Sequence, residues 1–356
     1  MRLGRFIVET HCHAQRIAAR IGDEDDISYQ RLREKMLTSV PADEATEDDQ
    51  VVIYDNSDRL MYDMDAYDVD MCVLQPGAWF ENRLNQEIME RHPDTFVSAA
   101  AAIQTEKAHM RGEEEWTIGA ACDEIEGWLN EDGFRMIGEG VPKQPSLDRV
   151  ISWEERRPQV REVFELADAY EVPVGWHTGY PSGYSSGKWR APDWEDPTLA
   201  GDIKEEFPDV PIIFQHGGMQ GHWRDTYVEK CCEVASAWDD VYLEVGLYWA
   251  DLMKLPYKDP NIGPEQMIWG GDWGASVPQV SQPDEEPPFY WDQRSDYGLP
   301  AHQCDYWGAA MRQMFQFAQD QQIEQDKLNL IMGGNIARLL DMEGPDPRLF
   351  EQYLDA

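Results

Sequence analysis

The stretch RFIVETHCH, residues 5–13, is a short apolar run that ends in two histidines separated by one residue. Side chains two positions apart in a β-strand lie on one face, so His11 and His13 would present both imidazoles to one point. Other apolar runs also end in a residue that can bind a metal: VPVGWH in His177, VPIIFQH in His216 and MIWGGD in Asp272. Imidazole nitrogens together with a carboxylate oxygen are the ligands typical of catalytic zinc and similar divalent ions. The recurrence of this pattern predicts a metal site.

Eight short runs rich in apolar or β-branched residues recur along the chain, and each has the length of a buried strand. They are residues 5–13, 69–76, 95–103, 133–140, 172–178, 210–217, 241–248 and 267–273. Segments with helical periodicity lie between them, at residues 82–91, 120–130, 160–170, 200–207 and 227–237. Alternating strands and helices indicate parallel pairing with covered sheet faces. Eight such units predict an α/β fold of the (β/α)₈ TIM-barrel type.

The alternative architecture is a doubly wound open sheet. Its usual marker, a GxGxxG motif after the first strand, is absent from the sequence. In an open sheet the carboxyl ends of the strands form a line, whereas in a barrel they converge on one mouth. Because a metal needs its ligands to converge, we expect a barrel with the metal site at the C-terminal face of its strands.

We expect residues 1–356 to form a single domain, with loop insertions at about 20–66, 180–198 and 274–303. The last two follow strands that carry candidate ligands, and both are rich in Gly, Pro, Ser and aromatic residues. Long ordered loops of this composition often roof an active site. A contact between subunits of a homodimer or a larger homo-oligomer is the alternative interpretation.

Composition limits the class of protein. The net charge of -39 comes from acidic residues scattered over the chain, which favours a halophilic, salt-adapted surface over a site for one basic partner. The sign of the charge disfavours binding to nucleic acid. No run of about 18 apolar residues predicts a membrane span, and the N-terminus lacks the pattern of a signal peptide, so we expect a cytoplasmic protein. The six cysteines show no CxxC spacing, which favours reduced thiols.

Five stretches in a fixed order resemble the amidohydrolase superfamily, and in particular its amidohydrolase-related (amidohydrolase 2) group. They are ETHCHA, PVGWHTG, IIFQHGG, GGDWG and GGNIARLL, and together they span nearly the whole chain. The group includes aminocarboxymuconate semialdehyde decarboxylase, γ-resorcylate decarboxylase and pyrone-dicarboxylate lactonase. The sequence departs from the group at Glu9, because the family motif usually begins with aspartate in Asp-x-His-x-His.

The resemblance implies a role for each strand-end residue. His11, His13, His177 and Asp272 would bind one divalent ion, with Zn²⁺ expected and Mn²⁺ the alternative. Asp272 would also accept a proton during catalysis. His216 would lie beside the metal and act on the substrate, or it would complete a second metal site. Such an ion lowers the pKa of bound water from about 15.7 toward about 7, and a nearby carboxylate can then take the proton.

Further residues have two interpretations each. Glu9 would orient a ligand histidine or, in a register shifted by two residues, bind the metal together with His11, because some decarboxylases of the group use Glu-x-His. Arg135 and Glu139 are four residues apart in one predicted strand, so both would point to one face and could bind substrate; Glu139 could also bridge two metals. A structural ion pair inside the barrel is the alternative for both. Trp176 would line a mouth suited to a planar substrate, or would pack in the core.

Two reaction classes fit this set of residues. The first is hydrolysis of a small carboxylated or cyclic substrate, such as a lactone or an amide, by metal-activated water. The second is metal-dependent, non-oxidative decarboxylation of an aromatic or enoic acid. The intact His-x-His and Asp272 favour hydrolysis, because they form the set that activates water. A binding protein without activity is disfavoured, because all the candidate ligands are present.

The charge of the chain predicts that its stability rises with salt. Screening by ions weakens the mutual repulsion of the acidic residues, so the melting temperature should increase between low salt and molar KCl. Thermal denaturation at several KCl concentrations measures this increase. A melting temperature that does not change with salt would contradict the halophilic interpretation.

Overall fold

A computed structural model of the chain describes residues 3–4, 6–14, 16–20, 51–55, 57–76, 81–144, 151–178, 196–219, 225–274 and 306–342. Within this part, eight strands form one parallel sheet, in the order in which they occur along the chain. They are β1 (Val8–Cys12), β4 (Met71–Leu74), β5 (Phe96–Ala100), β6 (Phe134–Ile137), β7 (Val174–His177), β8 (Ile212–Gln215), β9 (Val241–Glu244) and β10 (Met267–Ile268). Each predicted strand is found, and all eight are shorter than their apolar runs.

The sheet closes on itself between its first and last strands. Cys12 and Trp273 form a parallel bridge, the backbone N–H of His13 donates to Trp273 O at 2.7 Å, and the N–H of Trp273 donates to His11 O at 2.9 Å. The predicted (β/α)₈ barrel is therefore confirmed. The closure also sets His11 of β1, and His13 just after it, beside the segment that carries Asp272.

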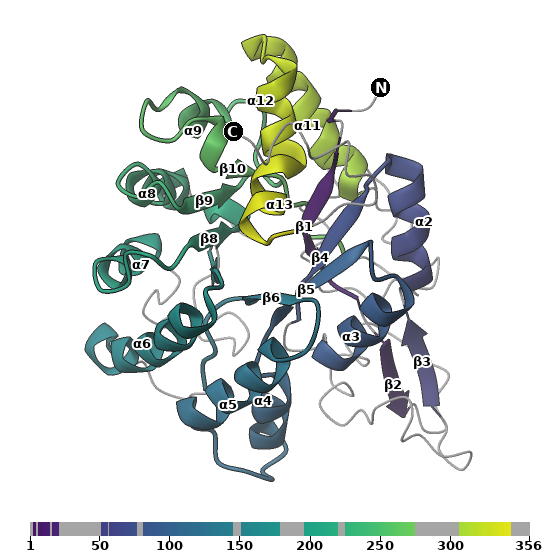
Figure 1. The fold of residues 1–356 in the computed structure, drawn as a ribbon, viewed down its shortest axis with the longest axis vertical. Helices are drawn as coiled ribbons and strands as arrows, with labels where there is room; N and C mark the ends of the chain where they lie inside the picture. The colour runs from purple at the N-terminus through teal and green to yellow at the C-terminus, as the bar shows by residue number, and fades with distance from the viewer. Residues whose placement is uncertain are drawn as a thin grey trace.

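Helices surround the strands, as Figure 1 shows. The five predicted helices correspond to α3 (Asn82–Arg91), α5 (Ile118–Leu129), α6 (Trp153–Tyr170), α7 (Pro197–Lys204) and α8 (Asp225–Ala235). The structure adds α2 (Ser57–Tyr67), α4 (Ile103–Met110), α9 (Lys254–Lys258), α11 (Tyr306–Gln321), α12 (Gln325–Asn329) and α13 (Asn335–Leu339). Helix α6 begins seven residues before the expected position, because Ser152 caps it by accepting a hydrogen bond from the backbone N–H of Glu155.

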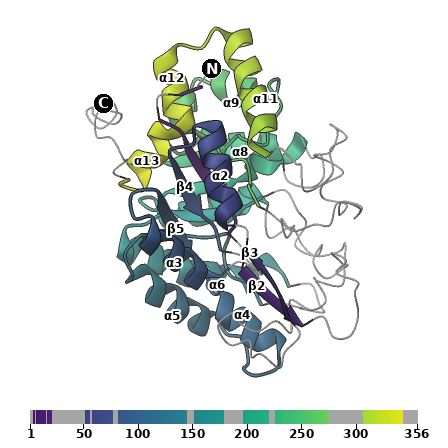
Figure 2. The same cartoon turned by 90° about the vertical axis from the view of Figure 1, so that its right-hand side faces the viewer.

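A second, two-stranded sheet stands apart from the barrel sheet (Figure 2). It pairs β2 (Arg16–Arg20) with β3 (Val51–Asp55) in antiparallel fashion. Both strands lie in or next to the insertion predicted at about 20–66, which also contains α2. The predicted insertion at 180–198 falls outside the described residues up to 195, and the one at 274–303 falls outside them from 275 onward.

Buried apolar side chains form two separate clusters. One includes Val73, Ala99 and Met136 from alternating positions of neighbouring strands, together with Ile336 of α13. The other fills the space between strands and helices. Two clusters are expected in a barrel, because alternating side chains of each strand point into the barrel and out toward the helices. The C-terminal stretch GGNIARLL packs against the entry to β1, where a Cβ on Gly333 would lie 2.7 Å from Phe6 O.

The five cysteines that the structure describes are free, in agreement with the predicted reduced thiols, and Cys304 lies outside the described residues. None of the helices in the described ranges is long and apolar enough to cross a lipid bilayer.

Candidate metal centre

Four histidines and two carboxylates gather at the carboxyl ends of the barrel strands. His11 belongs to β1 and His13 follows it, whereas His177 ends β7. Glu139, His216 and Asp272 follow β6, β8 and β10 within four residues. Parallel strands of a barrel end at the same face, so residues far apart in the sequence meet there.

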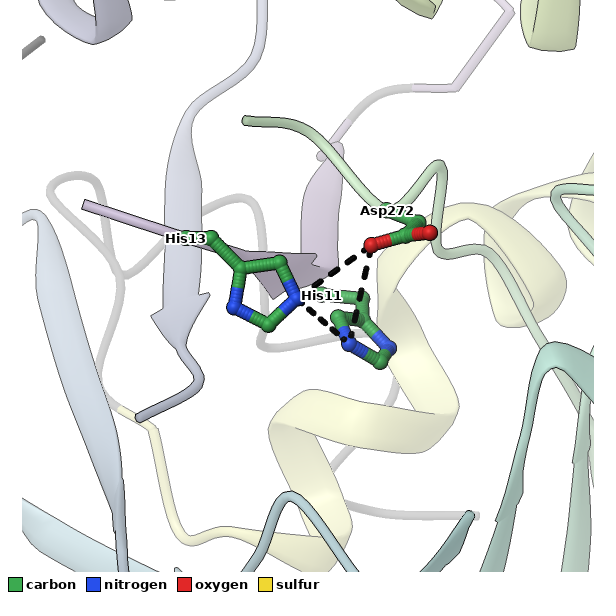
Figure 3. A group of neighbouring side chains, drawn as sticks. All are labelled: His11, His13 and Asp272. Atoms are coloured by element: carbon green, nitrogen blue, oxygen red, sulfur yellow. Dashed lines mark hydrogen bonds and ion pairs between the residues drawn. The ribbon is translucent and has the colours of Figure 1, made fainter. Parts of the chain in front are cut away.

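One group of potential ligands consists of His11, His13 and Asp272, drawn in Figure 3. The two Nε2 atoms lie 3.1 Å apart, and Oδ1 of Asp272 lies 3.2 Å from His13 Nε2 and 3.9 Å from His11 Nε2. All three side chains are buried. Three ligand atoms at this spacing can surround one small cation.

Glu139 lies among all four histidines. Its Oε1 is 3.1 Å from His177 Nε2, 3.5 Å from His216 Nε2 and 3.6 Å from His11 Nε2. Its Oε2 is 3.6 Å from His13 Nε2. Glu139, His177 and His216 thereby make a second group of potential ligands, and His11, His216 and Glu244 make a third that shares one histidine with each of the first two. The structure places His177 in this second group rather than with His11, His13 and Asp272, and Glu139 links the two groups.

The hydrogen bonds of the two β1-end histidines fix which ring nitrogen carries a proton. Nδ1 of His13 lies 2.8 Å from the carbonyl oxygen of Gln75, and Nδ1 of His11 lies 3.1 Å from a carboxylate oxygen of Glu244. Both oxygens can only accept, so each Nδ1 is the donor and each neutral ring has its lone pair on Nε2. Two lone pairs then face each other and the carboxylate of Asp272. This arrangement fits a bound cation, because a cation turns their mutual repulsion into coordination.

Two residues of the centre have an unusual backbone conformation. The φ angle is 62° at His216 and 55° at Asp272, in the left-handed region that non-glycine residues rarely adopt. Such a conformation costs on the order of 1–3 kcal/mol and persists where the surrounding structure enforces it, which is common at functional sites. The turns lie one residue after β8 and four residues after β10, and both side chains reach the centre.

The buried carboxylates and imidazoles shift each other's pKa. Burial alone would lower the pKa of His11, but the carboxylates of Glu244 and Glu139 outweigh burial and hold the pKa well above its usual value. For His216 burial prevails over Glu139 and Asp272, and its pKa is lowered. Burial would raise the pKa of Glu139, but the surrounding histidines hold it well below its usual range. The centre therefore keeps Glu139 ionised, and protons compete with a cation for His11.

Glu9 is fully buried next to the centre but belongs to neither ligand group. Its carboxylate accepts hydrogen bonds from the backbone N–H of Gly271 at 2.7 Å and of His11 at 2.9 Å, and from the indole N–H of Trp307. Burial outweighs these donors and raises the pKa of Glu9 to about 8. These contacts hold the turn before Asp272 against β1, which supports an orienting role.

Two residues expected to bind substrate lie elsewhere. The Arg135 side chain is 44% exposed and lies 3.9 Å from Oδ2 of Asp341, which is not a residue of the centre. The prediction that Arg135 and Glu139 share one face of a strand is wrong, because β6 ends at Ile137, before Glu139. Trp176 is buried against Phe164 of α6, with ring centroids 6.4 Å apart, because it alternates with His177 along β7.

Glu244 is a residue of the centre that was not predicted from the sequence. This residue ends β9, is buried, and contacts both His11 and the backbone of His216. The signal was present, because VYLE at residues 241–244 is another apolar run that ends in a carboxylate.

The raised pKa of His11 predicts that divalent-metal affinity falls as the pH falls from 8 to 6. A histidine must lose its ring proton to bind a metal, and a pKa well above 6.5 keeps protons competing throughout this interval. Zinc affinity measured by competition with a chelator at several pH values tests this. His11→Asn should lose zinc, whereas His92→Asn, outside the centre, should keep the wild-type profile. An affinity that is constant between pH 6 and 8 would contradict the prediction.

Comparisons with known proteins bear on both the fold and the family. Among solved structures, the chain is similar to 5-carboxyvanillate decarboxylase LigW from Sphingomonas paucimobilis, with a TM-score of 0.51 and 15% identity over 96% of this chain and 100% of that one. It is also similar to a probable 2-pyrone-4,6-dicarboxylic acid hydrolase from Acinetobacter baumannii, with a TM-score of 0.51 and 11% identity over 94% and 99%. An amidohydrolase from Burkholderia multivorans with bound zinc gives a TM-score of 0.53 and 10% identity over 95% and 100%.

At these identities the similarities show the shared barrel fold. No curated protein matches the chain. The family model described as Amidohydrolase (Amidohydro_2), however, matches residues 10–342. This match includes every residue of the two ligand groups. The chain therefore belongs to the amidohydrolase family.

Proposed function

We propose that this enzyme is a divalent-metal-dependent hydrolase that opens a small cyclic or carboxylated ester or amide, such as a lactone, with an activated water. The observation that carries the proposal is the position of Glu139, whose carboxylate lies within 3.6 Å of an Nε2 atom of all four histidines. The alternative is decarboxylation of an aromatic or enoic acid by the same centre.

Glu139 favours hydrolysis for an electrostatic reason. A decarboxylase would bring the carboxylate of its substrate against the cation, but here the ionised Glu139 carboxylate already lies among the candidate ligands. Two carboxylates that share one site repel each other. A neutral ester or amide carbonyl carries no such penalty. The centre is thus better suited to polarising a carbonyl than to holding a second carboxylate.

The number of donor groups supports more than one ion. Four imidazoles and the carboxylates of Glu139 and Asp272 exceed the four ligands of a tetrahedral site. The sequence predicted one ion; we infer one at His11, His13 and Asp272, with Glu139 linking it to a second position at His177 and His216. We propose zinc, in keeping with the zinc bound by the similar Burkholderia amidohydrolase. Bound divalent ions lower the pKa of water and polarise a carbonyl oxygen.

The other side chains of the centre would have separate roles in catalysis. Asp272 would accept a proton from the attacking water and return it to the leaving group, as a carboxylate within reach of both can. The lowered pKa of His216 keeps its ring neutral near pH 7, which leaves it able to bind a metal or to hydrogen-bond the substrate. His177, with a side chain 19% exposed, is the most exposed of the four histidines and would be the one that substrate reaches most easily.

Replacing Glu139 tests the link between the two groups. Glu139→Gln removes the charge but keeps the size, so zinc bound at His177 and His216 should be lost while about one ion per chain remains. Turnover should fall by about 10²-fold or more, the scale of one positioned catalytic group. Elemental analysis and rate measurements on zinc-loaded protein check both effects. Arg135→Ala, outside the centre, should match the wild type, and a Glu139→Gln protein with full zinc and full activity would refute the proposed role.

A substrate panel distinguishes the two reactions. Zinc-loaded enzyme is incubated with a series of lactones and amides and with a series of hydroxybenzoates, and acid release and CO₂ release are followed in parallel. We expect acid release from members of the first series and no CO₂ from the second. Release of CO₂ without hydrolysis of any lactone or amide would replace the hydrolase proposal with the decarboxylase.

A further inference from the structure

The side chain of Glu244 is buried and tightly packed next to the metal centre. The side chain is 1% exposed, and its Oε1 accepts a hydrogen bond from the hydroxyl of Thr10 at 2.9 Å. A Cβ on Gly270 would lie 2.4 Å from the same Oε1, so only glycine at position 270 leaves room for the carboxylate. The surroundings of the carboxylate are therefore built from β1, from the end of β9 and from the turn that follows β10.

The other oxygen of Glu244 contacts both ligand groups of the centre. Oε2 lies 3.1 Å from Nδ1 of His11 and accepts a hydrogen bond from the backbone N–H of His216 at 2.7 Å. His11 belongs to the group with His13 and Asp272, and His216 belongs to the group with Glu139 and His177, while both also lie in a third group with Glu244 itself. One carboxylate oxygen thus joins a residue from each group.

The two contacts have different effects. At His11 the carboxylate can only accept, so it holds the proton on Nδ1 and leaves the Nε2 lone pair directed at His13 and Asp272. At His216 it holds the backbone N–H of a residue with a φ of 62°, a conformation that needs external support. The first contact sets a tautomer, and the second stabilises a strained turn.

We propose that Glu244 is a positioning residue that organises both ligand groups, by fixing the tautomer of His11 and the backbone turn at His216. The inference rests on the proposed metal-dependent function. It assigns to Glu244 an action through the two histidines and no contact with the reacting atoms. Glu9, the other buried carboxylate beside β1, receives only backbone and indole N–H groups and cannot set an imidazole tautomer.

Glu244→Gln is the direct test, with zinc affinity measured by chelator competition and the melting temperature measured in excess chelator. Loss of a carboxylate that orients a metal-binding histidine weakens metal binding by about 10- to 100-fold, which is the expected effect. Asp240→Asn is the matched control: it makes the same acid-to-amide change at the other end of β9, where Asp240 pairs with Lys204. The control should lose stability but keep the wild-type zinc affinity.

Two further measurements decide the question if Glu244→Gln does not fold. Thr10→Val removes the hydroxyl that anchors Oε1, and should weaken zinc binding by about two- to tenfold, the scale of one hydrogen bond. In wild-type zinc-loaded protein labelled with ¹⁵N in its histidines, NMR should show His11 with its proton on Nδ1, the resonance being assigned with His11→Asn.

The results distinguish failure of the positioning role from failure of the proposed function. Unchanged zinc affinity in a folded Glu244→Gln protein, or a His11 ring with its proton on Nε2, would overturn the positioning role while leaving the hydrolase proposal intact. If the wild-type enzyme itself binds no divalent ion, the proposed function fails and this inference fails with it.

Discussion

Backbone hydrogen bonds between β1 and residues 269–273 close the barrel, and the metal centre depends on this closure. The N–H of Thr10 donates to Trp269 O, and His11 and His13 exchange backbone hydrogen bonds with Trp273. The first and last strands of the chain are thereby held in register. Because Asp272 lies within the paired segment, its carboxylate reaches His13 Nε2 at 3.2 Å. Glu9 adds to the same junction, because its carboxylate accepts a hydrogen bond from the backbone N–H of Gly271.

The closure concentrates charge in a small buried volume. Glu139, Glu244 and Asp272 lie among four imidazoles, and an ionised carboxylate in such surroundings must be paired or must bind a metal. The carboxylates approach the His11 and His13 rings from different sides. Glu139 and Asp272 lie near the Nε2 atoms, whereas Glu244 contacts His11 at Nδ1. Asp272 also lies 3.9 Å from Nδ1 of His216.

Local sequence patterns were enough to predict the strands and the histidines at their ends. Each strand is one apolar run, and a ligand at the end of a run is visible without knowledge of the rest of the fold. The failures arose where the regular strand stops. Arg135 was placed with Glu139 by counting alternate positions, but β6 ends at Ile137. VYLE marked Glu244 as a carboxylate at the end of an apolar run, but its contacts with residues 28 and 233 positions away, which give it importance, cannot be read from the local sequence.

The most direct test of the account is a crystal structure of zinc-loaded protein with anomalous scattering measured at the zinc absorption edge. A zinc ion bound as proposed would give an anomalous peak at about 2.0–2.2 Å from Nε2 of His11, Nε2 of His13 and a carboxylate oxygen of Asp272. A zinc ion bound through Nδ1 of these histidines, or the absence of an anomalous peak at the carboxyl ends of the strands, would contradict the proposed centre.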